Sequence, residues 1–139
     1  MIHIAVCEDK RQKREIWLRC LASLNREDVR TFAPEVSSTD DFLTEMRSYI
    51  EGEDVVGFDG VILDMQFSDD DRGGMLLWQS LVSEYGRDSL GELLVATKFA
   101  ENDIAVFADK FDGSLLTSQS ATHRAKALYD FMAAIDSHT

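Results

Sequence analysis

Cysteine, proline and basic side chains are scarce in this sequence. The two cysteines, Cys7 and Cys20, lie in apolar segments without metal-site spacing, so we expect reduced thiols and no disulfide. The single proline, Pro34, ends a short strand-like run. Only 14 basic residues face 26 acidic ones, and a formal charge of −12 repels phosphate backbones and anionic membranes. Direct binding to nucleic acid is therefore not expected.

Long hydrophobic runs are missing as well. No apolar stretch is long enough to span a bilayer, and no basic leader precedes the first apolar run at Ile2. We therefore expect a cytoplasmic protein without membrane contact. Hydrophobic residues still make up 45% of the chain, which shows no repeats and no interdomain linker, and this predicts one domain over residues 1–139.

Short apolar runs alternate with segments of helical periodicity. The runs typical of buried strands are 2–7, 29–32, 61–63, 93–97 and 114–117, and the helical segments are 10–24, 42–50, 77–85, 104–111 and 121–135. This alternation, with short connections, predicts a three-layer, doubly wound α/β domain with a five-stranded parallel sheet of the flavodoxin-like type and about five helices.

The sequence predicts the solvent exposure of two segments. In the first helical segment Trp17 is expected in the core, and five basic residues are expected on the solvent side: Lys10, Arg11, Lys13, Arg14 and Arg19. The stretch 65–74 is polar and ends in two glycines, so it is expected to be a surface loop.

Polar residues stand where the predicted strands end. They are Glu8, Asp9, Asp64, Thr97 and Thr117. Taken alone, Asp64 is equally a helix cap or a loop residue. In open α/β sheets, however, ligands bind outside the carboxyl ends of the strands, so these side chains are expected to meet on one edge. Clustered carboxylates call for a cation, and Mg²⁺ prefers oxygen ligands.

The stretches Cys7-Glu8-Asp9, 59–64 and 94–97 together resemble the receiver domain of two-component response regulators, the CheY-like superfamily. The resemblance covers nearly the whole chain, in order and in spacing. It implies that Asp64 is the phosphoacceptor and that Thr97 contacts a phosphoryl oxygen. It also implies a Mg²⁺ ion held by Glu8, Asp9, Asp64 and the backbone carbonyl of Gln66.

The sequence departs from that pattern in three places. Thr117 and Ser118 stand where receivers carry a Lys and a Pro after the last strand, so the usual cation is missing. Residues 66–68 replace the Met-Pro pair that follows the phosphoacceptor, and Ser114 stands where an aromatic switch residue is common. Lys98 is the only nearby base that we expect could substitute, provided that the chain has turned after Thr97.

Three functions follow from these observations. The first is a receiver that is phosphorylated on Asp64 by a histidine kinase or phosphotransfer protein and relays its state to a protein partner or a second copy. It would be a regulatory domain and not an enzyme acting on other substrates. The second is a pseudo-receiver, an interaction module that needs no phosphorylation. The third is a Mg²⁺-dependent phosphohydrolase, which is disfavoured because Gln66 cannot act as a general acid.

Overall fold

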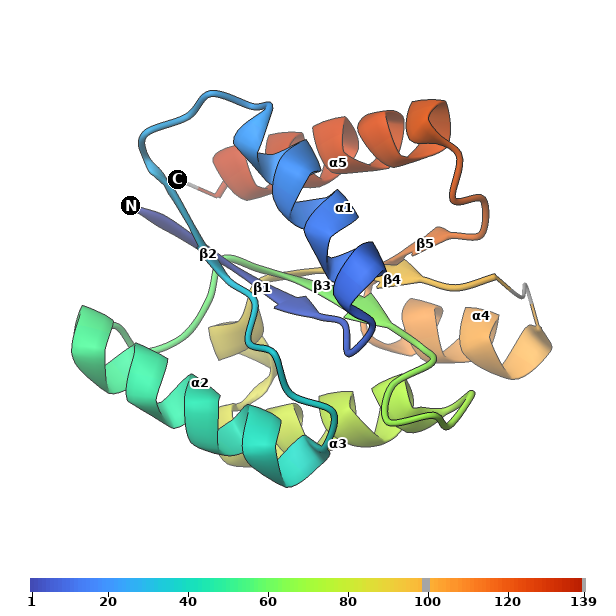
Figure 1. The fold of residues 1–139 in the computed structure, drawn as a ribbon, viewed down its shortest axis with the longest axis horizontal. Helices are drawn as coiled ribbons and strands as arrows, with labels where there is room; N and C mark the ends of the chain where they lie inside the picture. The colour runs from blue at the N-terminus through green and yellow to red at the C-terminus, as the bar shows by residue number, and fades with distance from the viewer. Residues whose placement is uncertain (99–100, 139) are drawn as a thin grey trace.

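The computed structural model describes residues 1–98 and 101–138. Within these residues strands and helices alternate, as predicted (Figure 1). The strands are β1 (Ile2–Cys7), β2 (Val29–Phe32), β3 (Gly60–Asp64), β4 (Glu92–Ala96) and β5 (Ser114–Leu116). The helices are α1 (Arg11–Ala22), α2 (Thr39–Glu53), α3 (Gly73–Tyr85), α4 (Asn102–Lys110) and α5 (Ala121–Asp136), with a short 3-10 helix, η1 (Arg87–Leu90), before β4.

The strands form one parallel sheet in the order β2-β1-β3-β4-β5. Helices α1 and α5 cover one face of the sheet, and α2, α3 and α4 cover the other (Figure 1). The predicted three-layer, doubly wound α/β fold is therefore confirmed. In the part of the chain that the structure describes, no helix combines the length and the apolar character that a membrane crossing requires.

The register of the sheet sets the positions of the polar residues. Cys7 pairs with Leu63, and Asp64 pairs with Ala96, so Glu8, Asp64 and Thr97 lie at or just beyond the ends of three neighbouring strands. Strand β2 lies on one side of β1, and β3 lies on the other side. The carboxyl ends of β1 and β3 therefore form a topological switch point, where open α/β sheets bind ligands.

Alternation along the strands divides the core in two. Ile62 packs with α1 and α5, whereas Leu63 packs with α2, α3 and α4. Asp64 follows in the same alternation as Ile62, so its side chain is directed to the α1 side of the sheet. The conformation of β3 therefore aims the predicted phosphoacceptor at the first turn of α1.

The segment after β3 differs from the expected surface loop. Met65 and Phe67 are each 1% exposed and belong to the core on the α2 side, while residues 69–71 are exposed as expected. Helix α3 also begins at Gly73, four residues before the first apolar position of its periodic pattern. Periodicity missed this turn because glycine carries no hydrophobic signal.

Candidate functional site

A small cavity lies at the carboxyl-terminal edge of the sheet. Its volume of about 20 Å³ has room for about one water molecule or one ion. Most of the residues that line it had been predicted for the site or follow β3 directly. They are Lys13, Asp64, Met65, Gln66, Asp71, Thr97, Lys98 and Gln119.

Asp64 is the carboxylate of this cavity. Its residue is 9% exposed, and its Oδ1 accepts a hydrogen bond from the backbone N–H of Gln66 at 2.7 Å. Its Oδ2 lies 3.7 Å from Nζ of Lys13. The strand end is held by close backbone packing, because a Cβ at Gly74 would lie 2.2 Å from the Asp64 carbonyl oxygen. Only glycine lets the first turn of α3 approach so closely.

Glu8 is a second buried carboxyl group, adjacent to Asp64. Its Oε1 accepts a hydrogen bond from the backbone N–H of Lys10 at 2.8 Å, whereas Oε2 has no partner among the described residues that meets hydrogen-bond geometry. Burial, followed by a hydrogen bond shared with Asp64 and the negative charge of Asp64, raises the pKa of Glu8 to about 9. The raised pKa favours the protonated, neutral form of Glu8 in the folded protein.

Asp9 contacts the loop after β3. Its Oδ2 accepts a hydrogen bond from the backbone N–H of Ser68 at 3.1 Å, and its Oδ1 is buried without a partner in the described chain. Across residues 1–98 and 101–138, no group of three or more His, Cys, Asp or Glu side chains is preassembled around a metal position. The predicted three-carboxylate metal site is therefore not preassembled in the described residues.

The donor set nevertheless suits Mg²⁺. Two buried carboxylate oxygens, one on Glu8 and one on Asp9, lack donors, and a hard cation with oxygen ligands would satisfy both. Glu8 and Asp9 would hold the ion together with Asp64 and the backbone carbonyl of Gln66. The ion would neutralise negative charge beside Asp64.

Two basic residues of α1 are not where periodicity placed them. Arg14 is 4% exposed, donates to the carbonyl of Glu8 at 3.3 Å and pairs with Glu35 at 3.1 Å. Lys13, whose side chain is 33% exposed, faces Asp64. The expectation that both point to solvent is wrong. Hydrophobic periodicity distinguishes core-facing from solvent-facing positions of a helix, but it does not identify positions that face the edge of the sheet. The available signal was the position of Lys13 one helical turn after Asp9.

The two predicted hydroxyl side chains, those of Thr97 and Thr117, lie in different environments. Thr97 is buried and lines the cavity, and its backbone N–H donates to the carbonyl of Leu116 at 3.0 Å. Lys98 lines the cavity from an exposed position. Thr117, at the usual position of the Lys, is exposed and is absent from the described lining, where Gln119 takes part instead.

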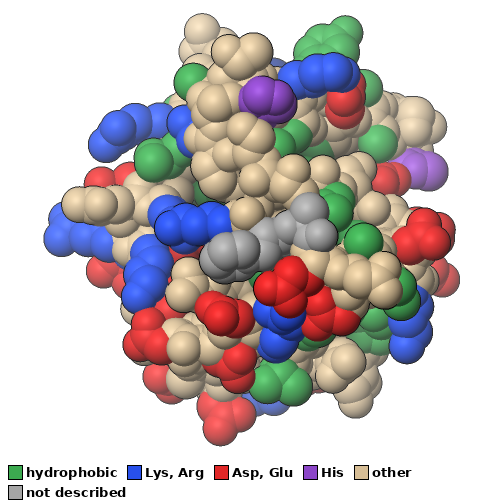
Figure 2. Space-filling view, turned by 90° about the vertical axis from the view of Figure 1, so that its right-hand side faces the viewer, with side chains coloured by type: hydrophobic (Ala, Val, Ile, Leu, Met, Phe, Trp, Pro, Cys, Tyr) green, Lys and Arg blue, Asp and Glu red, His purple; other side chains and the backbone are tan. Residues whose placement is uncertain are grey.

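Ion pairs join the loop after β3 to both neighbouring helices. Lys10, next to α1, pairs with Asp69 at 2.8 Å, and Arg72 pairs with Asp103 of α4 at 2.6 Å and with Glu101. Figure 2 shows the molecule from this side, with basic side chains gathered at the left of the view and acidic ones mostly in its lower half. The edge is therefore of mixed charge despite the acidic composition of the chain.

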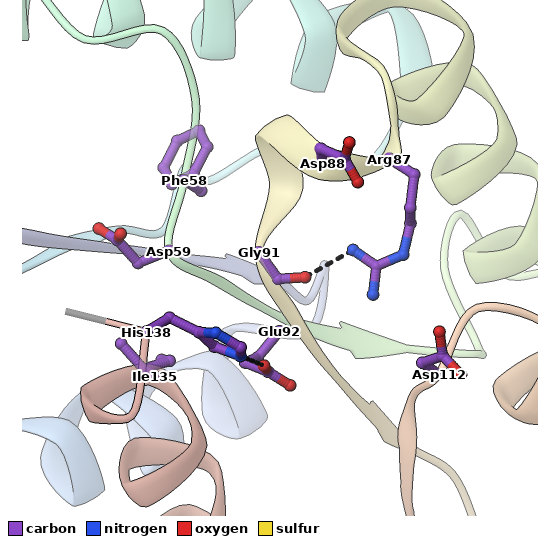
Figure 3. A pocket seen from close by; sticks show the side chains of 9 residues that line it. All are labelled: Phe58, Asp59, Arg87, Asp88, Gly91, Glu92, Asp112, Ile135 and His138. Atoms are coloured by element: carbon purple, nitrogen blue, oxygen red, sulfur yellow. Dashed lines mark hydrogen bonds and ion pairs between the residues drawn. The ribbon is translucent and has the colours of Figure 1, made fainter.

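A larger hollow, of about 510 Å³, lies at the opposite, amino-terminal edge of the sheet (Figure 3). Its polar groups are largely occupied by structural contacts. Arg87 donates to the carbonyls of Gly91 and Phe111, and His138 pairs with Glu92 at 2.8 Å. This hollow joins η1 to the ends of the sheet and α5, and it lies away from Asp64.

A parallel α/β fold with this strand order, and an acid at the end of its central strand, is the fold of response regulator receiver domains. The chain is similar to the CheY-like receiver domain from Methanospirillum hungatei JF-1 (13% identity, 99% of this chain and 95% of the other, TM-score 0.68). It is also similar to the signal receiver domain of a putative Luxo repressor protein from Vibrio parahaemolyticus (15% identity, 99% and 94%, TM-score 0.66). The BeF3-activated receiver domain of Klebsiella pneumoniae RstA is a third such structure (16% identity, 96% and 97%, TM-score 0.61). No family model and no curated protein matches the sequence.

Proposed function

We propose that this protein is a cytoplasmic receiver of a two-component system, in which Asp64 takes a phosphoryl group from a histidine kinase or phosphotransfer protein in the presence of Mg²⁺. The observation that carries the proposal is the environment of Asp64. A nearly buried carboxylate ends the central strand of a receiver fold, beside a cavity of ion size, a lysine and the partnerless oxygen of Glu8. The phosphorylated state would then be relayed to a protein partner or a second copy.

The transfer is a substitution at phosphorus. An oxygen of the Asp64 carboxylate forms the new O–P bond while the P–N bond of the donor phosphohistidine breaks, and the bonding electron pair leaves with the imidazole nitrogen. The protein has little covalent chemistry to perform beyond supplying the nucleophile. Its contribution is to orient Asp64 through the N–H of Gln66 and to place Thr97 beside the incoming oxygens.

The size of the cavity argues against the phosphohydrolase reading. A volume of about 20 Å³ holds an ion or a water molecule but gives no pocket for an organic substrate, for which a few hundred Å³ are usual. Gln66, two residues after Asp64, also lines the cavity and cannot protonate a leaving group. We therefore infer a regulatory domain that is phosphorylated on Asp64 and does not act on other substrates.

One observation favours the pseudo-receiver as the second candidate. The end of β5 offers the exposed Thr117 in place of a lysine, so the usual cation for the transferred group is missing there. In that case the fold would serve as a surface for a protein partner, without covalent change.

The test is the intact mass of the protein after incubation with phosphoramidate and Mg²⁺. We expect one phosphoryl adduct that is lost in Asp64→Asn and in the presence of EDTA. Asp112→Asn is the matched control, because it makes the same chemical change at the opposite edge of the sheet, where asparagine tolerates the positive φ of 54°. Absence of an adduct on the unchanged protein would contradict the proposal and leave the pseudo-receiver reading.

A further inference from the structure

We infer that Lys13, on the first turns of α1, is the cation that neutralises the group transferred to Asp64, in the place that other receivers give to a lysine after the last strand. This inference rests on the proposed function and deepens it. Its starting point is the distance of 3.7 Å between Lys13 Nζ and Asp64 Oδ2.

The structure offers few other cations for this role. Among the described residues that line the cavity, the basic ones are Lys13 and Lys98. Lys98 is exposed, whereas Lys13 keeps 33% of its side-chain surface and is paired with Asp64. The neighbouring Lys10 is engaged with Asp69, and Arg14 lies buried against Glu8 and Glu35. Lys13 is thus the basic residue that both faces Asp64 and borders the space into which a transferred group must enter.

The position of Lys13 follows from the backbone. Asp64 is directed to the α1 side of the sheet, and α1 begins at Arg11, immediately after the acidic corner that ends β1. A lysine on the first turn of this helix reaches the edge of the sheet with its amino group while its stem covers the helix surface. Helix α5 covers the same face of the sheet as α1, and Gln119, between β5 and α5, lines the cavity, so a lysine in that segment would approach the cavity from the same face. Position 13 on α1 and the segment after β5 are therefore alternative places for the one positive charge beside the transferred group.

Before transfer the same lysine compensates the two adjacent carboxyl groups. Its charge pairs with Asp64 at 3.7 Å. Lys13 and Mg²⁺ are then both cations beside one carboxylate, so each is expected to weaken the binding of the other. A lysine that only packed its stem on the sheet edge, with its charge in solvent, would leave Mg²⁺ affinity unchanged.

The experiment compares Lys13→Gln, Lys13→Arg and Lys98→Gln with the unchanged protein. Phosphorylation by phosphoramidate is followed by intact mass, and binding of Mg²⁺ alone is measured by calorimetry. We expect Lys13→Gln to be phosphorylated about a hundredfold more slowly, the low end for loss of one preorganised donor because the side chain is partly exposed. We expect it to bind Mg²⁺ about threefold to tenfold more tightly. Lys13→Arg should recover most of the rate, and Lys98→Gln should lose less than Lys13→Gln.

The matched control is Arg11→Gln, which removes one exposed positive charge from the same helix, where Arg11 pairs only with Glu15 among the contacts of the described chain. Its rate and its Mg²⁺ affinity should be unchanged. Thermal melts show whether each variant is folded.

The outcomes distinguish failure of the proposed function from failure of the role of Lys13. If the unchanged protein forms no adduct, the proposed function fails, and the role of Lys13 fails with it. If the adduct forms but Lys13→Gln is as fast as the unchanged protein, Lys13 alone is refuted. A larger loss in Lys98→Gln, or weaker Mg²⁺ binding in Lys13→Gln, also overturns the inference.

Discussion

Replacing Glu8 with glutamine should make the metal-free protein more stable, and increasingly so as the pH rises. Glu8 is buried beside Asp64, and burial, the shared hydrogen bond and the charge of Asp64 raise its pKa from 4.5 to about 9. The folded protein therefore keeps a proton that the unfolded chain releases above about pH 4.5. The stability contributed by protonated Glu8 is fully present below pH 4.5 and is lost as the pH rises toward 9. Glutamine is neutral at every pH.

The size of the effect follows from the linkage between protons and folding. Each pKa unit corresponds to about 1.36 kcal/mol, and pH 7 lies about 2.5 units above the ordinary pKa of Glu8, so keeping the proton would cost the unchanged protein about 3 kcal/mol at that pH. We expect a gain of about 1 to 3 kcal/mol for Glu8→Gln at pH 7. In a chain of this length the melting temperature rises by about 3 to 5 °C for each kcal/mol.

The assay is thermal unfolding in EDTA at pH 5 and at pH 8, with Glu45→Gln as the matched control. Glu45 is exposed on α2, on the other side of the sheet, so its substitution should change little at either pH. The difference between Glu8→Gln and the unchanged protein should widen from pH 5 to pH 8. A difference that stays constant over this range would refute the raised pKa of Glu8.

Addition of Mg²⁺ should reduce the stability advantage of Glu8→Gln. A ligand at a hundred times its dissociation constant stabilises the folded state by about 2.7 kcal/mol, and the unchanged protein should gain this amount at pH 8. Glu8→Gln lacks one of the proposed carboxylate ligands and should gain much less. If both proteins gain equally, Glu8 does not hold the ion.

Three further changes test the surroundings of the site. Gly74→Ala would place a Cβ 2.2 Å from the Asp64 carbonyl oxygen, so it should lower stability by about 1 to 3 kcal/mol in a denaturant titration and slow phosphorylation. The control Gly52→Ala lies in a helix with open space around it and should raise stability by about 0.5 to 1 kcal/mol in the same titration. Thr117→Lys supplies the lysine that receivers carry after β5; it should restore the phosphorylation rate in a Lys13→Gln background, and a rate that stays low would show that the two positions do not serve the same space. Arg14→Met keeps the volume but removes the donor to the Glu8 carbonyl, and it should weaken Mg²⁺ binding measured by calorimetry; unchanged affinity would contradict a positioning role for Arg14.

The sequence determined the order of strands and helices. Val61, Ile62 and Leu63 form an apolar run short enough for a strand and are closed by Asp64, and parallel strands place their carboxyl ends on one edge. That is enough to bring Asp64, Glu8 and Thr97 to adjacent strand ends, because the rules of parallel sheets do not depend on side-chain detail. The same reasoning correctly predicted Trp17 as a core residue.

Only the tertiary structure decided how the charged groups meet. Hydrophobic periodicity tells whether a helical position faces the core or the solvent, but Lys13 faces neither, since it lies over the edge of the sheet. The turn of Asp9 toward Ser68 depends on a loop whose buried Phe67 has no periodic signal. These contacts join residues more than fifty positions apart, and such distances are set by packing between elements, which local sequence does not encode.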